Sequence, residues 1–109
     1  MSADSRIPVV FGQQPGAQDV VLAEEGVAVA PALHVRRFTA ALPGHLAGCA
    51  CCVPRGAGGE ALAKLFRDRA TGAVPYFSRV VVLASPAGRG AIRAVLEDDA
   101  LTRARYRLG

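Results

Sequence analysis

The chain has no tryptophan, only six other aromatic side chains and a single lysine among its 109 residues. Its apolar runs are short, and none approaches the roughly 20 residues that a membrane-spanning helix needs. The N-terminus shows neither the basic start nor the long apolar stretch of a signal peptide. These features predict a cytoplasmic protein with no membrane partner.

Acidic residues are fewer than basic ones, so the formal net charge is +4, and twelve of the thirteen basic residues are arginine. The arginines are scattered, and the densest group is Arg103, Arg105 and Arg107. Such a group is typical of a solvated face, so we expect no nucleic-acid partner. With 51% apolar residues the chain can bury a core, which predicts a single globular domain over residues 1–109.

Cysteine is confined to one place, because the three cysteines are Cys49, Cys51 and Cys52. An odd number cannot pair completely, and disulfides are rare in the cytoplasm. Reduced thiolates this close together can share one soft metal ion. The alternative is that they are small buried apolar side chains with no chemistry.

A zinc site usually has four ligands, so three thiolates need one more. His45, four residues before Cys49, is the best local candidate, and His34 is the second. Water or a partner protein could also occupy that position, and three thiolates with an open position suit metal transfer. We expect zinc, although thiolates also bind copper(I).

The first half of the chain is rich in short apolar runs. Residues 7–11 are typical of a first or edge strand with a proline near its start. Further short strands are predicted over residues 20–23, 27–30 and 34–38. Whether residues 12–46 form ordered sheet is left open by the pattern.

The second half has clearer periodicity. After flexible glycines, residues 60–70 are predicted to form a helix that buries Leu62, Leu65 and Phe66. Residues 80–84 form a β-branched run typical of a buried parallel strand. A second helix is predicted from Ser85-Pro86 onward, running to Ala104. This alternation predicts an α/β fold, a small, mostly parallel sheet with flanking helices.

Residues 46–108 resemble the CobW family of P-loop GTPases, which handle metals. The Gly-Cys-x-Cys-Cys signature of that family is matched by residues 48–52, and residues 72–82 and 96–108 resemble the segments that follow it. The resemblance implies a P-loop-type half domain, a metal site at Cys49, Cys51 and Cys52, and a metallochaperone role.

The nucleotide-binding elements of that family are missing. A P-loop requires Gly-x-x-x-x-Gly-Lys-Ser/Thr, because the lysine and hydroxyl hold the phosphates and magnesium. Residues 11–18 keep two glycines but have no lysine and no hydroxyl, and the chain has no Asn-Lys-x-Asp motif. We therefore expect a degenerate P-loop-type domain that binds no nucleotide and is not an enzyme.

Two functional hypotheses follow. The first is a metal-binding protein, for zinc, that resembles CobW-type metallochaperones without GTPase activity and passes the metal to another protein. The second is a non-catalytic interaction or regulatory module that docks on a full-length CobW-type GTPase or another partner. In the second case the cysteines are retained without a function.

Overall fold

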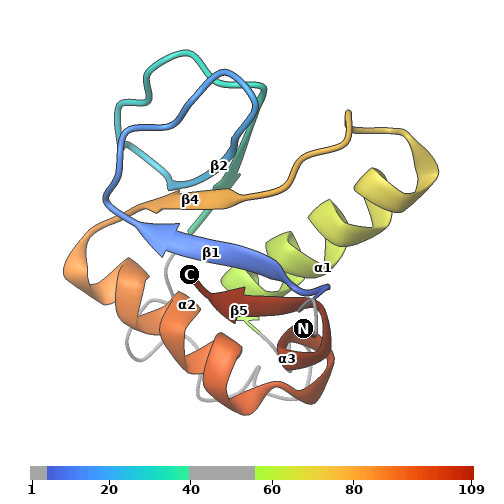
Figure 1. The fold of residues 1–109 in the computed structure, drawn as a ribbon. Helices are drawn as coiled ribbons and strands as arrows, with labels where there is room; N and C mark the ends of the chain where they lie inside the picture. The colour runs from blue at the N-terminus through green and yellow to red at the C-terminus, as the bar shows by residue number, and fades with distance from the viewer. Residues whose placement is uncertain (1–4, 40–55) are drawn as a thin grey trace.

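The computed structural model of the chain describes residues 5–39 and 56–109. In chain order its elements are β1 (Ile7–Phe11), β2 (Val20–Glu24), β3 (His34–Phe38), α1 (Gly56–Thr71), β4 (Val80–Leu83), α2 (Pro86–Asp98), α3 (Ala100–Arg105) and β5 (Tyr106–Leu108). The strands of the described residues form one five-stranded sheet in the order β3-β2-β4-β1-β5 (Figure 1). Every pairing in it is parallel. This confirms the predicted α/β fold with a parallel sheet and flanking helices.

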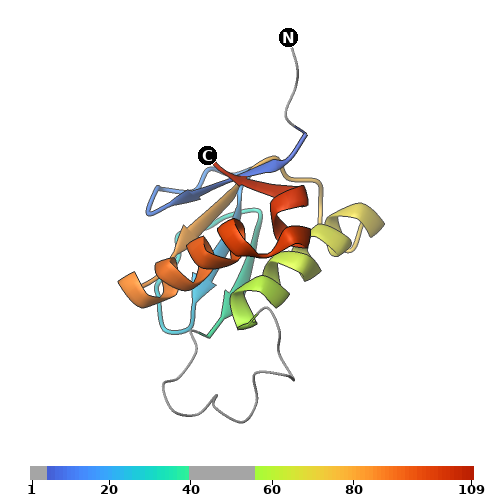
Figure 2. The same ribbon diagram turned by 90° about the horizontal axis from the view of Figure 1, so that it is seen from below.

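The three helices lie together on one face of the sheet (Figure 2). The chain moves along the sheet in one direction from β1 to β3 and in the other direction from β3 to β5. Right-handed crossovers place connections of opposite direction on opposite faces. The helices lie in the connections that run in the second direction, from β3 to β4 and from β4 to β5. Residues 12–19 and 25–33 form the connections that run in the first direction, and they contain no helix.

The main core lies between the sheet and the helices. Its strand residues alternate with those that face the opposite side, as a pleated sheet requires. The fully buried members include Val9, Val20, Leu22, Val80 and Val82 from the strands and Leu62, Leu65 and Ile92 from the helices. A smaller layer on the opposite face consists of Val21, Ala23 and Val81, against which Val29 and Ala32 pack. The β-branched run of β4 is therefore buried on both faces, as predicted.

Residues 27–30 do not form the predicted strand. The chain turns at Gly26, which has φ +90°, and the Val27 N–H donates to the Glu24 carbonyl at 3.1 Å. The Val27 carbonyl accepts from the Arg37 guanidinium at 2.6 Å, so it is bound to a side chain instead of a neighbouring strand. The apolar residues of this segment cover the sheet instead of extending it.

The glycines before the predicted helix are part of it, because α1 begins at Gly56 and not at residue 60. A Cβ atom at Gly58 would lie 2.5 Å from Ile92 Cδ1 of α2. A glycine there lets the two helices approach closely. What reads as a flexible stretch in the sequence is a helix–helix contact in the fold.

The second helix does not run to Ala104, because the chain breaks at Asp99. The Asp99 carboxylate accepts hydrogen bonds from the Thr102 N–H at 2.9 Å and its hydroxyl at 2.7 Å. An aspartate is disfavoured at a helix C-terminus but favoured as an N-cap, and here it starts α3.

Strand β5 has no counterpart in the predicted elements, and it places β1 inside the sheet instead of at its edge. Tyr106 is buried, and its hydroxyl donates to the Leu62 carbonyl of α1 at 2.7 Å. Pro8 is tolerated because it lies before Val9, the first residue of β1 that pairs with β4. Within residues 5–39 and 56–109, no helix has the length and apolarity needed to cross a membrane.

Candidate functional site

The four predicted metal ligands, Cys49, Cys51, Cys52 and His45, lie outside the described residues. Elsewhere, across the ranges that the structure describes, no three His, Cys, Asp or Glu side chains gather into a metal-binding group. The predicted metal site lies within residues 40–55.

The described residues on either side of this segment lie next to each other. Phe38, the last residue of β3, is 4% exposed, and Gly58, in the first turn of α1, is buried. A Cβ atom at Gly58 would lie 4.0 Å from Phe38 Cδ2. The two described flanks thus lie together at the carboxyl edge of the sheet, which is the edge where the strands end. Parallel α/β proteins carry their functional segments at this edge.

An open groove of about 550 Å³ lies at the same place. It is bordered by the end of β3 and the first half of α1, with four basic and two acidic side chains: Arg36, Arg37, Lys64, Arg67, Glu25 and Glu60. Its charge is mixed, with basic side chains in excess. Its importance is its position, beside both ends of residues 40–55.

His34, the second candidate for the fourth ligand, lies at the opposite end of β3. It lies four positions before Phe38, or roughly 13 Å along the strand. Its Nε2 atom lies 3.5 Å from the Arg36 guanidinium, which also pairs with Asp68 of α1 at 2.9 Å. Burial, and then the positive charge of Arg36, lower the pKa of His34. Its position and its contact with Arg36 disfavour His34 as a metal ligand.

The two glycines where the resemblance predicts a degenerate phosphate loop, Gly12 and Gly16, use their N–H groups within the protein. The Gly12 N–H donates to the Val82 carbonyl at 2.9 Å, and the Gly16 N–H donates to the Asp19 carboxylate at 2.8 Å. Residues 12–19 lead directly into β2 without a helix. A phosphate loop needs free N–H groups and a following helix. Here neither glycine N–H is free, and no helix follows before β2.

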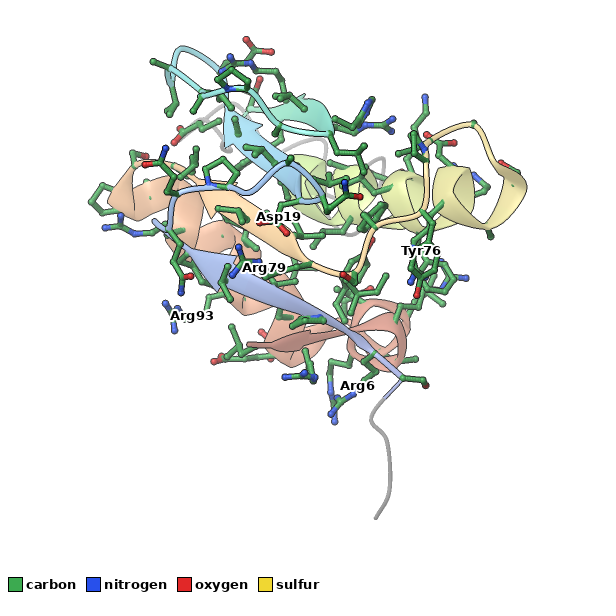
Figure 3. The ribbon with its side chains drawn as sticks, turned by 45° about the horizontal axis from the view of Figure 1, so that its top comes forward. Arg6, Asp19, Tyr76, Arg79 and Arg93 are labelled. Atoms are coloured by element: carbon green, nitrogen blue, oxygen red, sulfur yellow. The ribbon has the colours of Figure 1, made fainter. Side chains whose placement is uncertain are left out.

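Asp19 attaches the end of the connection over residues 12–19 to the sheet. Its carboxylate is largely buried and pairs with the Arg79 guanidinium at 2.5 Å, and Figure 3 shows the two side chains pointing toward each other. The hydrogen bond from Arg79 is the main reason that the pKa of Asp19 is lowered. Arg79 also contacts the Gln13 side chain at 3.4 Å. This ion pair connects the start of β2 with the start of β4, between residues that are 60 positions apart.

The crevice where an α/β sheet usually binds its ligand lies between β2 and β4. The connection after β2 leads toward β3 and that after β4 leads toward β5, so the two connections diverge there. In this protein the Glu24 carboxylate occupies the crevice. It accepts hydrogen bonds from the Ser85 N–H at 2.8 Å and the Ser85 hydroxyl at 2.7 Å.

Ser85 is the N-cap of α2, as predicted, and its hydroxyl accepts from the Gly88 N–H at 3.2 Å. A Cβ atom at Gly88 would lie 2.6 Å from the Glu24 Oε1 atom. The first turn of α2 is thus fitted to a carboxylate of the protein itself. Helix N-termini often bind phosphate. Here the N-terminus of α2 is already occupied by an anion of the protein, the Glu24 carboxylate.

Sequence reasoning missed Glu24, Asp19 and Arg79. Glu24 is visible in the sequence only as half of the acidic pair Glu24-Glu25, Asp19 belongs to no motif, and Arg79 lies in residues 72–82 without a predicted role. The only available signal is that each residue stands at the end or the start of a strand. Such a position does not identify the partner.

Comparison of the chain with protein-family models, with curated proteins and with solved structures gives no match. The resemblance to the CobW family therefore rests on the sequence of residues 46–108.

Glu24 should make the stability of the protein depend on pH. Hydrogen bonds from the Ser85 hydroxyl, and then from its N–H, lower the pKa of Glu24. Its stabilising contribution is therefore complete above the unfolded value, about 4.3, and is lost as the pH falls through the folded pKa. We expect Glu24→Gln to lower the Tm at pH 7, and the difference from the wild type to shrink below about pH 4.

Glu25→Gln is the matched control, because it removes the same charge from an exposed neighbouring residue. It should leave the Tm at pH 7 nearly unchanged. Thermal unfolding followed by circular dichroism at several pH values measures both variants. An equal loss of Tm in the two variants would show that the contact of Glu24 with Ser85 does not account for the stabilisation.

Proposed function

We propose that this protein binds a soft metal ion, zinc, through Cys49, Cys51 and Cys52, with His45 as the fourth ligand. The observation that carries the proposal is the presence of three thiols within four residues, in a segment that follows the parallel edge strand β3 and precedes a helix. The donor set fits zinc, since three thiolates and one imidazole form a common tetrahedral site.

The described surroundings of the segment support a role in metal transfer. Both of its flanks are fixed in the core, by Phe38 on one side and by the buried Gly58 on the other. Functional residues are often carried by a segment that a rigid scaffold positions. The proposed role is to carry zinc and pass it to a receiving protein, in the cytoplasm, where thiols remain reduced.

The same proposal includes the loss of GTPase activity. The N–H groups of Gly12 and Gly16 are bound within the protein, and the Glu24 carboxylate occupies the N-terminus of α2. These contacts support the part of the proposal in which this relative of CobW-type metallochaperones binds no nucleotide and has no GTPase activity.

Native mass spectrometry of protein purified without chelator tests the proposal. We expect one zinc ion per chain in the wild type and none in a variant with all three cysteines replaced by serine. His34→Ala is the control and should retain the metal, because His34 lies at the far end of β3. Circular dichroism of each variant verifies that the fold is intact.

A wild-type protein that stays free of metal after zinc is added would contradict the metal proposal. The alternative would then take its place. In that alternative the chain is a non-catalytic module that docks on a full-length CobW-type GTPase or another partner, and its cysteines have no function.

A further inference from the structure

Strand β3 is one edge of the sheet, because β2 is its only neighbouring strand among the described residues. It pairs with β2 over its whole length. The Glu25 N–H donates to the Phe38 carbonyl at 2.9 Å, so the backbone of Phe38 is directed toward β2. Successive residues of a strand direct their backbone groups to opposite sides, so those of Val35 and Arg37 are directed away from the sheet.

The arginines of β3 do not shield this outer edge. Natural edge strands are often protected from a further strand by charged side chains, prolines or bulges. Here the Arg36 guanidinium binds the Asp68 carboxylate of α1 at 2.9 Å. The Arg37 guanidinium binds the carbonyls of Glu24 and Val27 at 3.1 and 2.6 Å. Because both side chains are bound to the protein itself, neither is available to cover the outer backbone groups of β3.

The groove between β3 and α1 runs beside this edge. Its α1 wall includes Glu60, Lys64 and Arg67, whose spacing places them on one face of the helix. Lys64 and Arg67 are exposed, and neither makes a hydrogen bond or an ion pair with any residue that the structure describes. The wall therefore presents two cations that are available to carboxylates of a partner.

The other side of the same edge carries an exposed apolar side chain. Side chains of a strand alternate between the two faces of a sheet, and Phe38 of β3 lies in the core on the helix face. Val35 is therefore directed to the opposite face, where it is 36% exposed. A strand added beside β3 would alternate in the same way, with every second side chain toward Lys64 and Arg67 and the others toward Val35.

We propose that β3 binds an extended segment of another protein as an added strand, and that acidic and apolar residues alternate in this segment. In strand addition the backbone hydrogen bonds supply affinity and the alternate side chains supply specificity. The backbone partners are Val35 and Arg37, and the acidic side chains lie against Lys64 and Arg67. The surface involves none of the cysteines, so this proposal and the metal proposal can fail separately.

A second copy of the chain fits this edge less well. Strand β3 has two arginines and a histidine but no acidic residue. A second β3 would therefore bring further cations toward Lys64 and Arg67, and like charges on neighbouring strands are destabilising. The charges favour an acidic partner over a homodimer.

A short capped peptide in which glutamate and valine alternate is the probe, and the same peptide with lysine in place of each glutamate is its control. Each is titrated into the ¹⁵N-labelled full chain at constant ionic strength and followed by NMR and by amide hydrogen exchange. We expect saturable shifts along β3 with the glutamate peptide only. Exchange should slow at the N–H groups of Val35 and Arg37 and change least at Arg36, whose N–H is directed toward β2.

Val35→Pro tests the backbone part of the proposal. It removes an outward N–H group without removing a hydrogen bond to β2, and proline is tolerated on an edge strand where its nitrogen faces solvent. The variant should fold and should lose the binding of the glutamate peptide.

Lys64→Gln combined with Arg67→Gln tests the charges and should weaken binding about five-fold or more. Arg93→Gln combined with Arg103→Gln is the matched control, because it removes two charges from exposed residues of α2 and α3. These helices lie toward the other edge of the sheet, since Arg93 is over the Phe11 ring of β1 and α3 leads into β5. The control should bind the peptide as the wild type does.

Equal binding of the two peptides, or an equal loss of affinity in the control variant, would overturn the proposal in favour of general charge attraction. Slow exchange of the Val35 and Arg37 N–H groups in the free protein would also overturn it, because the edge would then be covered already. Exchange that depends on protein concentration would identify a second copy as the cover, and exchange that does not would identify another part of the chain. The spectra of the variants report whether each one is folded.

Discussion

We expect the Val82→Asp variant to be unfolded in buffer. Val82 is fully buried in β4 and pairs with Phe11 of β1 on one side and with Leu22 of β2 on the other. An aspartate there cannot reach water. Burying its unpaired charge costs several kcal/mol, and about 2 kcal/mol of apolar burial is lost as well. A small domain with about 5–15 kcal/mol of total stability does not survive that loss.

Far-UV circular dichroism and urea denaturation measure the outcome. Val35→Asp is the matched control, because it makes the same substitution on the outer strand β3, where Val35 is 36% exposed. Its carboxylate stays in water, so this variant should unfold cooperatively with a stability close to that of the wild type. If Val82→Asp unfolded cooperatively as well, β4 could not be the central strand of the sheet.

The second large effect concerns zinc affinity. In a titration against a chromophoric chelator, we expect Cys51→Ser combined with Cys52→Ser to weaken zinc binding on the order of 10³-fold or more, because two of the four proposed ligands are lost. Zinc binds the thiolate, so protons compete with the metal. The affinity of the wild type should therefore fall steeply below about pH 6.

Replacing each histidine in turn tests which one is the fourth zinc ligand. His45→Ala should weaken binding on the order of ten-fold or more if the imidazole is the fourth ligand. His34→Ala should leave zinc affinity unchanged, since His34 lies beside Arg36 at the start of β3. Equal zinc affinities in the wild type and the double cysteine variant would show that the cysteines do not bind the ion.

The cysteine site remains a prediction of the sequence. Its thiols, with His45, lie in residues 40–55, and the structure describes only the flanks of that segment, at Phe38 and Gly58. The fold places both flanks of the segment at the carboxyl edge of the sheet, where the chemistry of parallel α/β proteins is usually found. That location is a result of the topology and could not be deduced from the spacing of the cysteines.

Local patterns in the sequence determined the elements in which apolar residues form a continuous run or recur at the helical period. The β-branched run of β4 and the period of Leu62 and Leu65 in α1 predict a buried strand and a helix correctly. Ser85 before a proline likewise predicts the start of α2. In each case the signal lies within a few residues, because strand and helix periods and caps are local properties.

Only the tertiary structure decided which distant residues meet. Glu24 and Ser85 are 61 positions apart, and the groove beside β3 draws on β3 and on α1, which residues 40–55 separate in the chain. A side chain larger than that of Gly58 would collide with Ile92 of α2. No periodicity encodes such pairs, since they depend on the order of strands in the sheet and on the side on which each connection crosses.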